Sequence, residues 1–371
     1  MVSRRLPYGP LRPLLWPHTG YLQTFQRLVG AAGLLVPLSL LPLFFGCVAL
    51  MVQVLPLAFL ASDRLAPVVP RRSLRLAGGL ACLFVPDVWE FSGNVTNTQW
   101  FLAVLACLVL VAPRARGWGW KTVDVVVVLL SGLSGPFGIL LAPVAVILAL
   151  RRRSRAQWGL SCVVCALALL QGVVLAISAA SQRASPVAPA HVTVAEGMEL
   201  VVARMILMPI SGPSHAIRVA GLLYPWGDSL IALLGAALIG AALLKTQLEV
   251  RLLLVFGLLI LAATMAATRI SWSEMTNLDW AERYWFIPML TWLLALAVLA
   301  FGTRWHLVRP FCMGLLVTFL LVGVAGNWTY PTPANEHFQR SAAEFEAASS
   351  GQTVKFAENP PGWGFLLTKK A

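Results

Sequence analysis

The chain alternates between long apolar runs and short segments rich in arginine and proline. This pattern predicts membrane-embedded helices over residues 34–61, 74–85, 101–112, 122–130, 138–150, 158–180, 228–245, 251–267, 284–302 and 311–326. Several of these runs are shorter than the roughly 20 residues that a full span needs. We therefore expect an all-α, polytopic transmembrane helical bundle of about ten membrane-embedded segments, several of them in short hairpins.

Composition agrees with this interpretation. Of the 371 residues, 58% are hydrophobic and only 12% are charged, and the mean hydropathy is +0.79. Soluble domains carry about 25% charged residues, so the expected surroundings are a lipid bilayer. The net charge of +13 does not indicate a nucleic-acid partner. The basic residues cluster between apolar runs, as is typical of cytoplasmic loops that face anionic lipid.

The distribution of charge also predicts a topology. The loops assigned to the inner side hold more than half of the Lys and Arg residues but only three acids, Asp63, Asp124 and Glu249. Segment 122–150 is basic at both ends, which predicts a hairpin with an outward tip at 131–137. A single kinked span is the alternative. The four arginines of the N-terminal segment conflict with the outer position that this topology gives it.

The same topology divides the chain into three parts: an extracytoplasmic or interfacial segment 1–31, a transmembrane domain 32–326 and an extracytoplasmic tail 327–371. An amphipathic helix is expected over 18–27, and in the tail a helix over 336–348 and a strand over 353–367 that is broken at Pro360. The largest outer loop is expected at 181–224, and a second outer segment at 269–283.

Polar side chains gather in the loop at residues 86–100, between two apolar runs. The loop holds two carboxylates, three amides and two tryptophans: Asp87, Glu90, Asn94, Asn97, Gln99, Trp89 and Trp100. Polar groups at the edge of hydrocarbon are costly unless they are satisfied or used. Carboxylates, amides and aromatic faces together suit a sugar, so this loop is predicted to form part of a ligand site.

Asp87 and Glu90 are the candidate catalytic residues. Their i, i+3 spacing would place both carboxylates on one side of a helical turn. There they would bind a divalent metal ion, orient an acceptor hydroxyl or act as a general base. The alternative is two solvated acids that cap a turn outside the membrane.

Arg283 and Tyr284 stand where the second outer segment enters a span. An arginine at this depth is suited to a lipid phosphate, and an interfacial anchor is the alternative. His191 and His215 have the chemistry of metal ligands, but solvated loop histidines are the preferred interpretation. Cys162 and Cys165 lie in an apolar helix without companion ligands, so they are interpreted as packing residues.

A set of short motifs resembles a known family. They are Gly20-Tyr-Leu with Arg27, Glu90 through Asn94-Val-Thr-Asn97-Thr-Gln-Trp100, Leu133-Ser-Gly-Pro-Phe137, Arg283-Tyr284 and Asn359-Pro-Pro-Gly-Trp363. With these motifs the chain resembles, nearly end to end, bacterial membrane proteins related to the GT-C class of glycosyltransferases. The resemblance implies a multi-pass protein of the bacterial inner membrane that uses a polyprenyl-phosphate-linked sugar and a glycan acceptor.

On this resemblance the expected activity is sugar transfer to an envelope glycan or other acceptor at the extracytoplasmic face. Glu90 or Asp87 would act on the acceptor or a metal, Arg283 on the phosphate, and Asn94, Asn97, Gln99, Trp100 and Tyr284 would line the site. One feature departs from the class, whose first outer loop usually supplies an acid: no Asp or Glu precedes Asp63. A non-catalytic partner in envelope glycan assembly, and a permease or flippase, are the alternatives.

Overall fold

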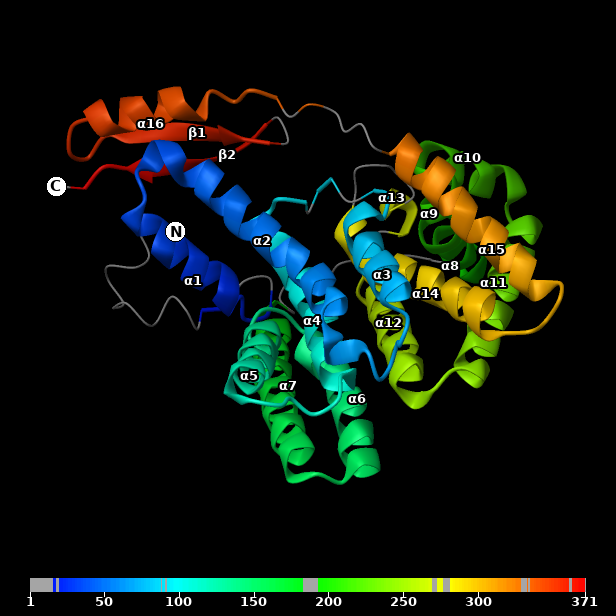
Figure 1. The fold of residues 1–371 in the computed structure, drawn as a ribbon. Coiled ribbons are helices and arrows are strands. Elements are labelled where there is room, and N and C mark those ends of the chain that lie inside the picture. Colours follow the sequence, from blue (N-terminus) through cyan, green and yellow to red (C-terminus); the bar gives the residue numbers. More distant parts are fainter. Residues whose placement is uncertain are drawn as a thin grey trace.

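The structure is a computed structural model that describes residues 16–17, 20–87, 89–90, 92–182, 193–268, 272–275, 281–327, 332, 334–359 and 362–370. Over these residues the chain is mostly helical, with one small sheet near the C-terminus (Figure 1). The predicted helical class is therefore confirmed.

The helices follow the predicted runs closely. In the first half they are α1 (Thr24–Ala32), α2 (Leu41–Ala61), α3 (Arg72–Phe84), α4 (Thr98–Val111), α5 (Trp118–Gly132), α6 (Phe137–Arg152) and α7 (Arg155–Gln182). In the second half they are α8 (Val194–Val201), a π-helical turn η7 (Val202–Leu207), α9 (Met208–Ser211), α10 (Pro213–Leu223), α11 (Trp226–Lys245), α12 (Leu248–Ala267), α13 (Trp272–Met275), α14 (Phe286–Gly302), α15 (Val308–Thr318) and the π-helical η10 (Phe319–Val324).

Among the described residues, five helices are long and apolar enough to cross a membrane. They span Leu38–Ala61, Arg155–Ala180, Trp226–Lys245, Leu248–Ala267 and Glu282–Gly302, and two shorter apolar helices cover Val95–Val111 and Val308–Val324. Length and composition therefore indicate a membrane protein. The larger number of about ten embedded segments stays a prediction, because α3, α4, α5 and α6 have only 13 to 16 residues.

Helix α4 lies at the centre of the first half of the bundle. Thirteen of its residues are buried, and it packs against α2, α5, α6 and α12. Fourteen residues rise about 21 Å, which is less than the roughly 30 Å of bilayer hydrocarbon. Because neighbouring helices enclose α4 on all sides, it does not need the length of a lipid-facing span.

The predicted inner loops meet at one end of the bundle, which we call the inner end (62–71, 112–117, 151–155, 245–248 and 302–308). Arg64 donates to the carbonyl of Pro113 at 2.9 Å and to both carboxylate oxygens of Asp124 at 3.0 and 2.8 Å. Gln247 donates to the carbonyl of Val68, and the Lys245 ammonium lies 4.9 Å from the Trp305 ring centroid. These contacts join loops that are far apart in sequence.

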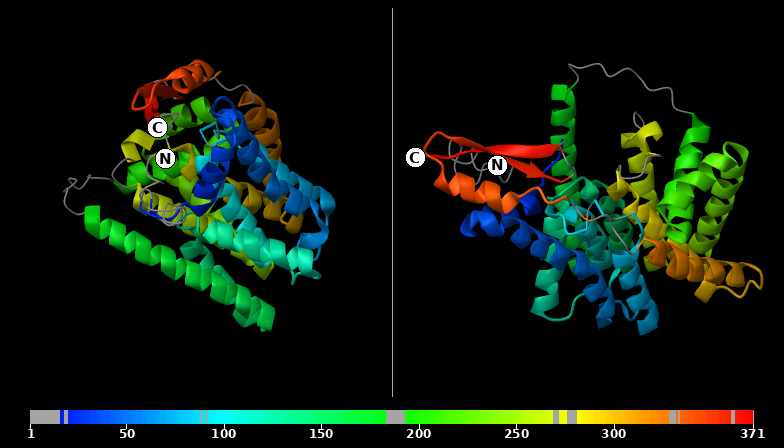
Figure 2. Two further views of the ribbon diagram at one scale, coloured as in Figure 1. Left: turned by 90° about the vertical axis from the view of Figure 1, so that its left-hand side faces the viewer. Right: turned by 90° about the horizontal axis from the view of Figure 1, so that it is seen from above.

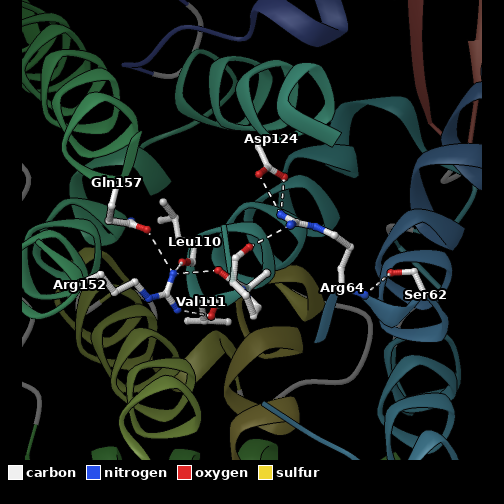
Figure 3. A network of polar contacts seen from close by, with 9 residues as sticks. Ser62, Arg64, Leu110, Val111, Asp124, Arg152 and Gln157 are labelled. Atoms are coloured by element: carbon white, nitrogen blue, oxygen red, sulfur yellow. Dashed lines mark hydrogen bonds and ion pairs between the residues drawn. The ribbon is translucent and has the colours of Figure 1, made fainter. Parts of the chain in front are cut away.

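Arg152 ties the same end together, as Figure 3 shows. Its guanidinium donates to the carbonyls of Leu110, Val111 and Ala112 at 2.5 to 3.1 Å and to the Gln157 side chain at 3.1 Å. The last carbonyls of a helix have no partner within the helix. Arg152 therefore satisfies the C-terminal carbonyls of α4, and it also pairs with Glu249 at 3.4 Å.

The segment 118–152 folds as a hairpin, as the charge pattern predicted. Asp124 of α5 and Arg152 of α6 both reach the inner end, while the connection between these helices lies at the opposite end. There the Leu133 carbonyl accepts from the Thr24 N–H at 3.0 Å, and the Ser134 hydroxyl accepts from the Phe25 N–H at 2.9 Å. A single kinked span does not fit this arrangement.

Two helix starts differ from the sequence-based expectation. The helix expected over 18–27 begins at Thr24, because Gln23 forms a bridge with Ser134 of the hairpin instead of joining the helix. The first long helix begins at Leu41, not at Leu34, with Pro42 in its first turn. Proline is suited to a helix start because it has no N–H to leave unsatisfied.

The segment 181–224, predicted as an outer loop, is mostly helical and partly buried in the part that the structure describes, and its outer position stays a prediction. From Val194 to Leu223 the chain forms α8, η7, α9 and α10, and residues 202–206 of η7 are all buried. The apolar run 200–210 packs against α11 and α14, so burial and not hydration determines its structure. Residues 183–192, which include His191, lie outside the described residues.

The C-terminal residues form a small unit beside the bundle (Figure 2). Helix α16 (Phe338–Ala347) covers a hairpin of β1 (Thr353–Glu358) and β2 (Trp363–Thr368), which pair antiparallel with Phe356 opposite Phe365. These rings stack with centroids 5.1 Å apart, and Phe338 lies 5.2 Å from Phe356. Both the helix and the interrupted strand predicted in the tail are confirmed.

Candidate active site at the outer end

The end of the bundle opposite to the inner end holds the 86–100 loop, and we call it the outer end. Helix α3 ends at Phe84, Asp87 adopts a left-handed backbone with φ 58°, and α4 begins at Thr98 after one 3₁₀ turn, η6 (Val95–Asn97). The described residues between Phe84 and Val95 form bends and turns. The helical turn that was expected to align Asp87 with Glu90 is therefore absent from them, and the two carboxylates meet different partners.

Asp87 pairs with Arg204 in the interior. The guanidinium donates to Asp87 Oδ2 at 2.5 Å, and both side chains are almost fully buried. Arg204 also donates from Nε to the carbonyl of Met275 at 2.8 Å. Since Arg204 lies on the π-helical η7, this pair links the 86–100 loop to a helix more than 100 residues away. The Asp87 carboxylate is thus fixed in the interior and is not accessible to solvent.

Glu90 is bound at two points by consecutive residues of η9 (Glu282–Tyr284). Its Oε1 accepts from the Arg283 guanidinium, and its backbone N–H donates to Glu282 Oε2 at 2.9 Å. The Glu90 side chain is 23% exposed and that of Arg283 34% exposed. Unlike Asp87, Glu90 is therefore within reach of a molecule that arrives at the outer end.

Arg283 is in contact with a group of aromatic rings. Its guanidinium carbon lies 4.8 Å from the Tyr284 ring centroid, in a cation–π arrangement. The Tyr284 ring meets Trp100 edge to face at 5.5 Å, and Trp100 meets Phe137 of the hairpin tip at 4.8 Å. These contacts bring Trp100 of the 86–100 loop together with Arg283 and Tyr284, which the sequence indicated as a separate pair.

The two asparagines hold the turn around Glu90. Asn94 Nδ2 donates to the Glu90 carbonyl at 3.2 Å, and its Oδ1 accepts from the Thr96 N–H at 2.9 Å. Asn97 Nδ2 reaches the same carbonyl at 3.5 Å. Asn94 is exposed and Asn97 is buried, so Asn94 is the amide that a ligand meets first.

Gln99 lies deeper, between the N-terminal segment and the hairpin tip. Its Nε2 donates to the Tyr21 hydroxyl at 3.3 Å. A Cβ at Gly135, whose φ is +140°, would come within 2.9 Å of Gln99 Oε1, so this approach requires glycine. The Gln26 amide, another buried group at this end, donates to the Thr96 carbonyl at 3.1 Å.

Several buried polar atoms at the outer end have no hydrogen-bond partner among the described residues. They include Glu90 Oε2, Gln26 Oε1, Gln99 Oε1 and Trp100 Nε1, with the hydroxyls of Thr24 and Ser131. Such atoms are uncommon in native interiors. Both acceptors and donors occur among them, so the group is suited to a ligand that donates and accepts hydrogen bonds, as sugar hydroxyls do.

A metal centre does not fit these donors. Each of the two carboxylates proposed as ligands is engaged by an arginine. The described residues contain no group of three or more His, Cys, Asp or Glu side chains placed to hold a metal ion. His215 is exposed on α10, which agrees with a solvated histidine.

Arg204 is the residue that sequence reasoning missed. It is a lone charge in the apolar run 200–210, and that isolation is the one local signal of its role. The pairing of Glu282 with the Glu90 backbone has no local signal at all, because the two residues are 192 positions apart.

A second buried acid lies away from this site. Asp228, in the first turn of α11, is fully buried, and neither of its oxygens has a hydrogen-bond partner in the part of the chain that is described. Glu199 of α8 is near enough to repel it. Burial and the neighbouring charge of Glu196 raise the pKa of Glu199 above its ordinary value.

Comparison with protein-family models, with curated proteins and with solved structures gives no match to this chain.

Proposed function

We propose that the protein is a membrane glycosyltransferase that moves a sugar from a polyprenyl-phosphate donor to an acceptor, an envelope glycan or another hydroxyl compound, at the extracytoplasmic face. The observation that carries this proposal is the Glu90–Arg283 pair. In this pair a carboxylate and a guanidinium lie side by side, partly exposed, at one end of an apolar bundle, which supports the roles of proton acceptor and phosphate-binding group.

The reaction needs few groups from the protein. The acceptor hydroxyl loses its proton to Glu90 as its oxygen forms a bond to the anomeric carbon of the donor. The bond from that carbon to the phosphate oxygen breaks, and the polyprenyl phosphate leaves with the electron pair. Arg283 stabilises the negative charge on the departing phosphate through charge-assisted hydrogen bonds.

The other predicted residues support these two. Asn94, Asn97 and Gln99 carry amides at or beneath the turn, and Trp100 and Tyr284 supply aromatic surface for the sugar. Asp87 has a different role in this proposal. Since it is buried against Arg204, it positions the turn that presents Glu90 and does not itself meet the acceptor. Glu90 then carries the role that an acid of the first outer loop has in the GT-C class.

The proposal includes the predicted topology. About ten membrane-embedded segments would cross or enter the bacterial inner membrane, with both termini and the 86–100 loop outside. The gathering of the basic loops at the inner end supports this orientation, because positively charged loops favour the cytoplasmic side.

Replacement of Glu90 tests the function in cells. Glu90→Gln retains the shape of the side chain and removes its charge, so the envelope glycan that is lost on gene deletion should stay absent or fall sharply. The matched control is Glu344→Gln, which opens the exposed Arg340–Glu344 pair on α16 and should restore the glycan fully. Full restoration by Glu90→Gln at normal protein level would favour the non-catalytic assembly partner instead.

One observation favours the permease or flippase as a second candidate. An ionisable residue buried at a membrane helix is a frequent site of ion or proton coupling, and Asp228 is such a residue. If transport is the function, Asp228→Asn should abolish it while Glu90→Gln leaves it unchanged. The opposite result supports the transferase.

A further inference from the structure

The turn at Glu90 and the 3₁₀ helix η9 are joined as a two-point clasp. Arg283 binds the Glu90 carboxylate, and the neighbouring Glu282 binds the Glu90 backbone N–H. Ala281, which precedes η9, has a left-handed backbone with φ 59°, a conformation that costs energy for a residue with a Cβ. The chain therefore accepts an unfavourable conformation next to the clasp.

The two bonds of the clasp differ in how easily a ligand can replace them. The bond from the Glu90 N–H to Glu282 involves a fully buried carboxylate. The Glu90–Arg283 bond is partly exposed, and the guanidinium rests on the Tyr284 ring, which leaves its N–H donors free to turn toward another anion without loss of the aromatic contact. An arriving anion would thus open the side-chain bond and leave the backbone bond in place.

A phosphate group is well matched to that exchange. A sugar-linked polyprenyl phosphate is a phosphodiester that carries one negative charge, as a carboxylate does, and its two free oxygens accept paired hydrogen bonds from a guanidinium. Glu90 and a phosphate compete for the same donors, so one of them must be released. A carboxylate bound to a guanidinium is also a weaker proton acceptor than a free one.

We infer that the Glu90–Arg283 pair is a latch that a phosphate group opens. This inference rests on the proposed function, and it adds an order of events. Without donor, Arg283 stays paired with Glu90 and the carboxylate is not free to accept a proton. When the donor phosphate takes Arg283, Glu90 is released to accept the proton of the acceptor hydroxyl. The acceptor is therefore activated only in the presence of donor.

The latch predicts that a substitution that prevents catalysis improves binding. In Glu90→Gln the competitor of the phosphate has lost its charge, so the full-length protein should bind a polyprenyl monophosphate, the leaving group of the donor, more tightly by roughly twofold to fivefold, the range expected for release of a partly exposed ion pair. Binding is measured with the radiolabelled lipid in phosphatidylcholine nanodiscs, and inorganic phosphate is titrated in a second arm to separate a lipid headgroup from free phosphate.

Two further variants complete the experiment. Glu90→Asp shortens the carboxylate, so it should also tighten binding, and it is available if the Gln variant does not fold. Glu344→Gln should leave the affinity at the wild-type value, because its ion pair lies on the C-terminal unit. If the Glu90 variants bind only the lipid more tightly, the latch responds to a lipid headgroup. If they also bind inorganic phosphate more tightly, it responds to any phosphate.

Unchanged or weaker binding in both Glu90 variants would overturn the latch. That failure is separate from failure of the proposed function. If wild-type protein transfers sugar and the affinity does not change, the transferase stands without a latch. If the affinity for the phosphate rises in the Glu90 variants but the wild-type protein does not transfer sugar, the phosphate latch stands and the transferase does not.

Discussion

The two ends of the bundle both place arginines against polar partners, yet they are built differently. At the inner end, Arg152 and Arg64 donate to backbone carbonyls at the end of α4 and just beyond it, as well as to acids (Figure 3). At the outer end, Arg283 binds one partly exposed carboxylate, that of Glu90, and donates to no backbone carbonyl among the described contacts.

The difference shows which network stabilises the fold and which is available for chemistry. A guanidinium that caps the carbonyls of a buried helix satisfies groups that have no other partner, so its loss affects folding. A carboxylate–guanidinium pair near the surface contributes little to stability. Left-handed non-glycine backbones occur at both ends, at Asp87 and Ala281 and at Arg153, so they do not distinguish the two networks.

Within the outer end, the Asp87–Arg204 pair should behave like the inner network, and its loss should have the largest effect. Arg204→Met leaves the buried Asp87 charge without its guanidinium, which typically destabilises a protein by about 3–5 kcal/mol. We expect poor accumulation and a lowered unfolding midpoint. Adding Asp87→Asn should recover most of the loss, since no charge is then buried alone; a double variant as unstable as the single one would contradict this role.

Arg152→Met should have the second-largest effect on stability. It removes charged hydrogen bonds to the C-terminal carbonyls of α4, so the free energy of unfolding should fall by about 2–3 kcal/mol. Sugar transfer per folded molecule should not change. Arg151→Met is the matched control, because Arg151 is exposed one position away and should tolerate the change. Equal losses of stability at both positions would show that the hydrogen bonds from Arg152 to the α4 carbonyls do not stabilise the fold.

Arg283→Lys should have the opposite effect to Arg152→Met: sugar transfer should fall and stability should not change. A point charge replaces a planar fork, so donor use should fall about tenfold, the equivalent of one charged hydrogen bond. The unfolding midpoint should stay at the wild-type value, because the side chain is partly exposed. Transfer at the wild-type rate would show that Arg283 is an interfacial anchor and has no role at the phosphate.

The smallest functional effect is expected from single cysteines that report the position of each end. In a cysteine-free background, Ser92→Cys and Ser349→Cys should label from outside intact cells, whereas Arg155→Cys at the start of α7 should label only after permeabilisation. Ser185→Cys tests the segment at 183–192, which the structure does not describe. Labelling of Ser92→Cys only after permeabilisation would contradict the outer position of the proposed site.

Much of this arrangement follows from local patterns in the sequence. Apolar runs give the helices, the basic ends of 122–150 give the hairpin, and the Pro360–Pro361 break separates the two strands of the tail. Both members of the Glu90–Arg283 pair were named as site residues from their neighbours alone. Their contact was not predicted, because it joins positions 193 apart.

What local patterns could not supply is the pairing of distant charges. Segment 181–224 was assigned to an outer loop because most of it is polar or weakly amphipathic, and its helices were not predicted, although the run around Arg204 is apolar enough to be buried. Asp87 was grouped with Glu90 through its spacing, and the grouping failed because Asp87 itself has a left-handed backbone and the two carboxylates bind different arginines. Only the fold shows that one acid is buried against Arg204 and the other is presented at the surface.

The rate of sugar transfer by purified protein with Glu90→Gln tests the central claim most directly. The assay follows a labelled sugar from a polyprenyl-phosphate donor to the acceptor, with the unfolding midpoint measured on the same preparation. Loss of the base should reduce the rate by about 10²-fold or more at an unchanged midpoint. Transfer at the wild-type rate would contradict a catalytic role for the outer end.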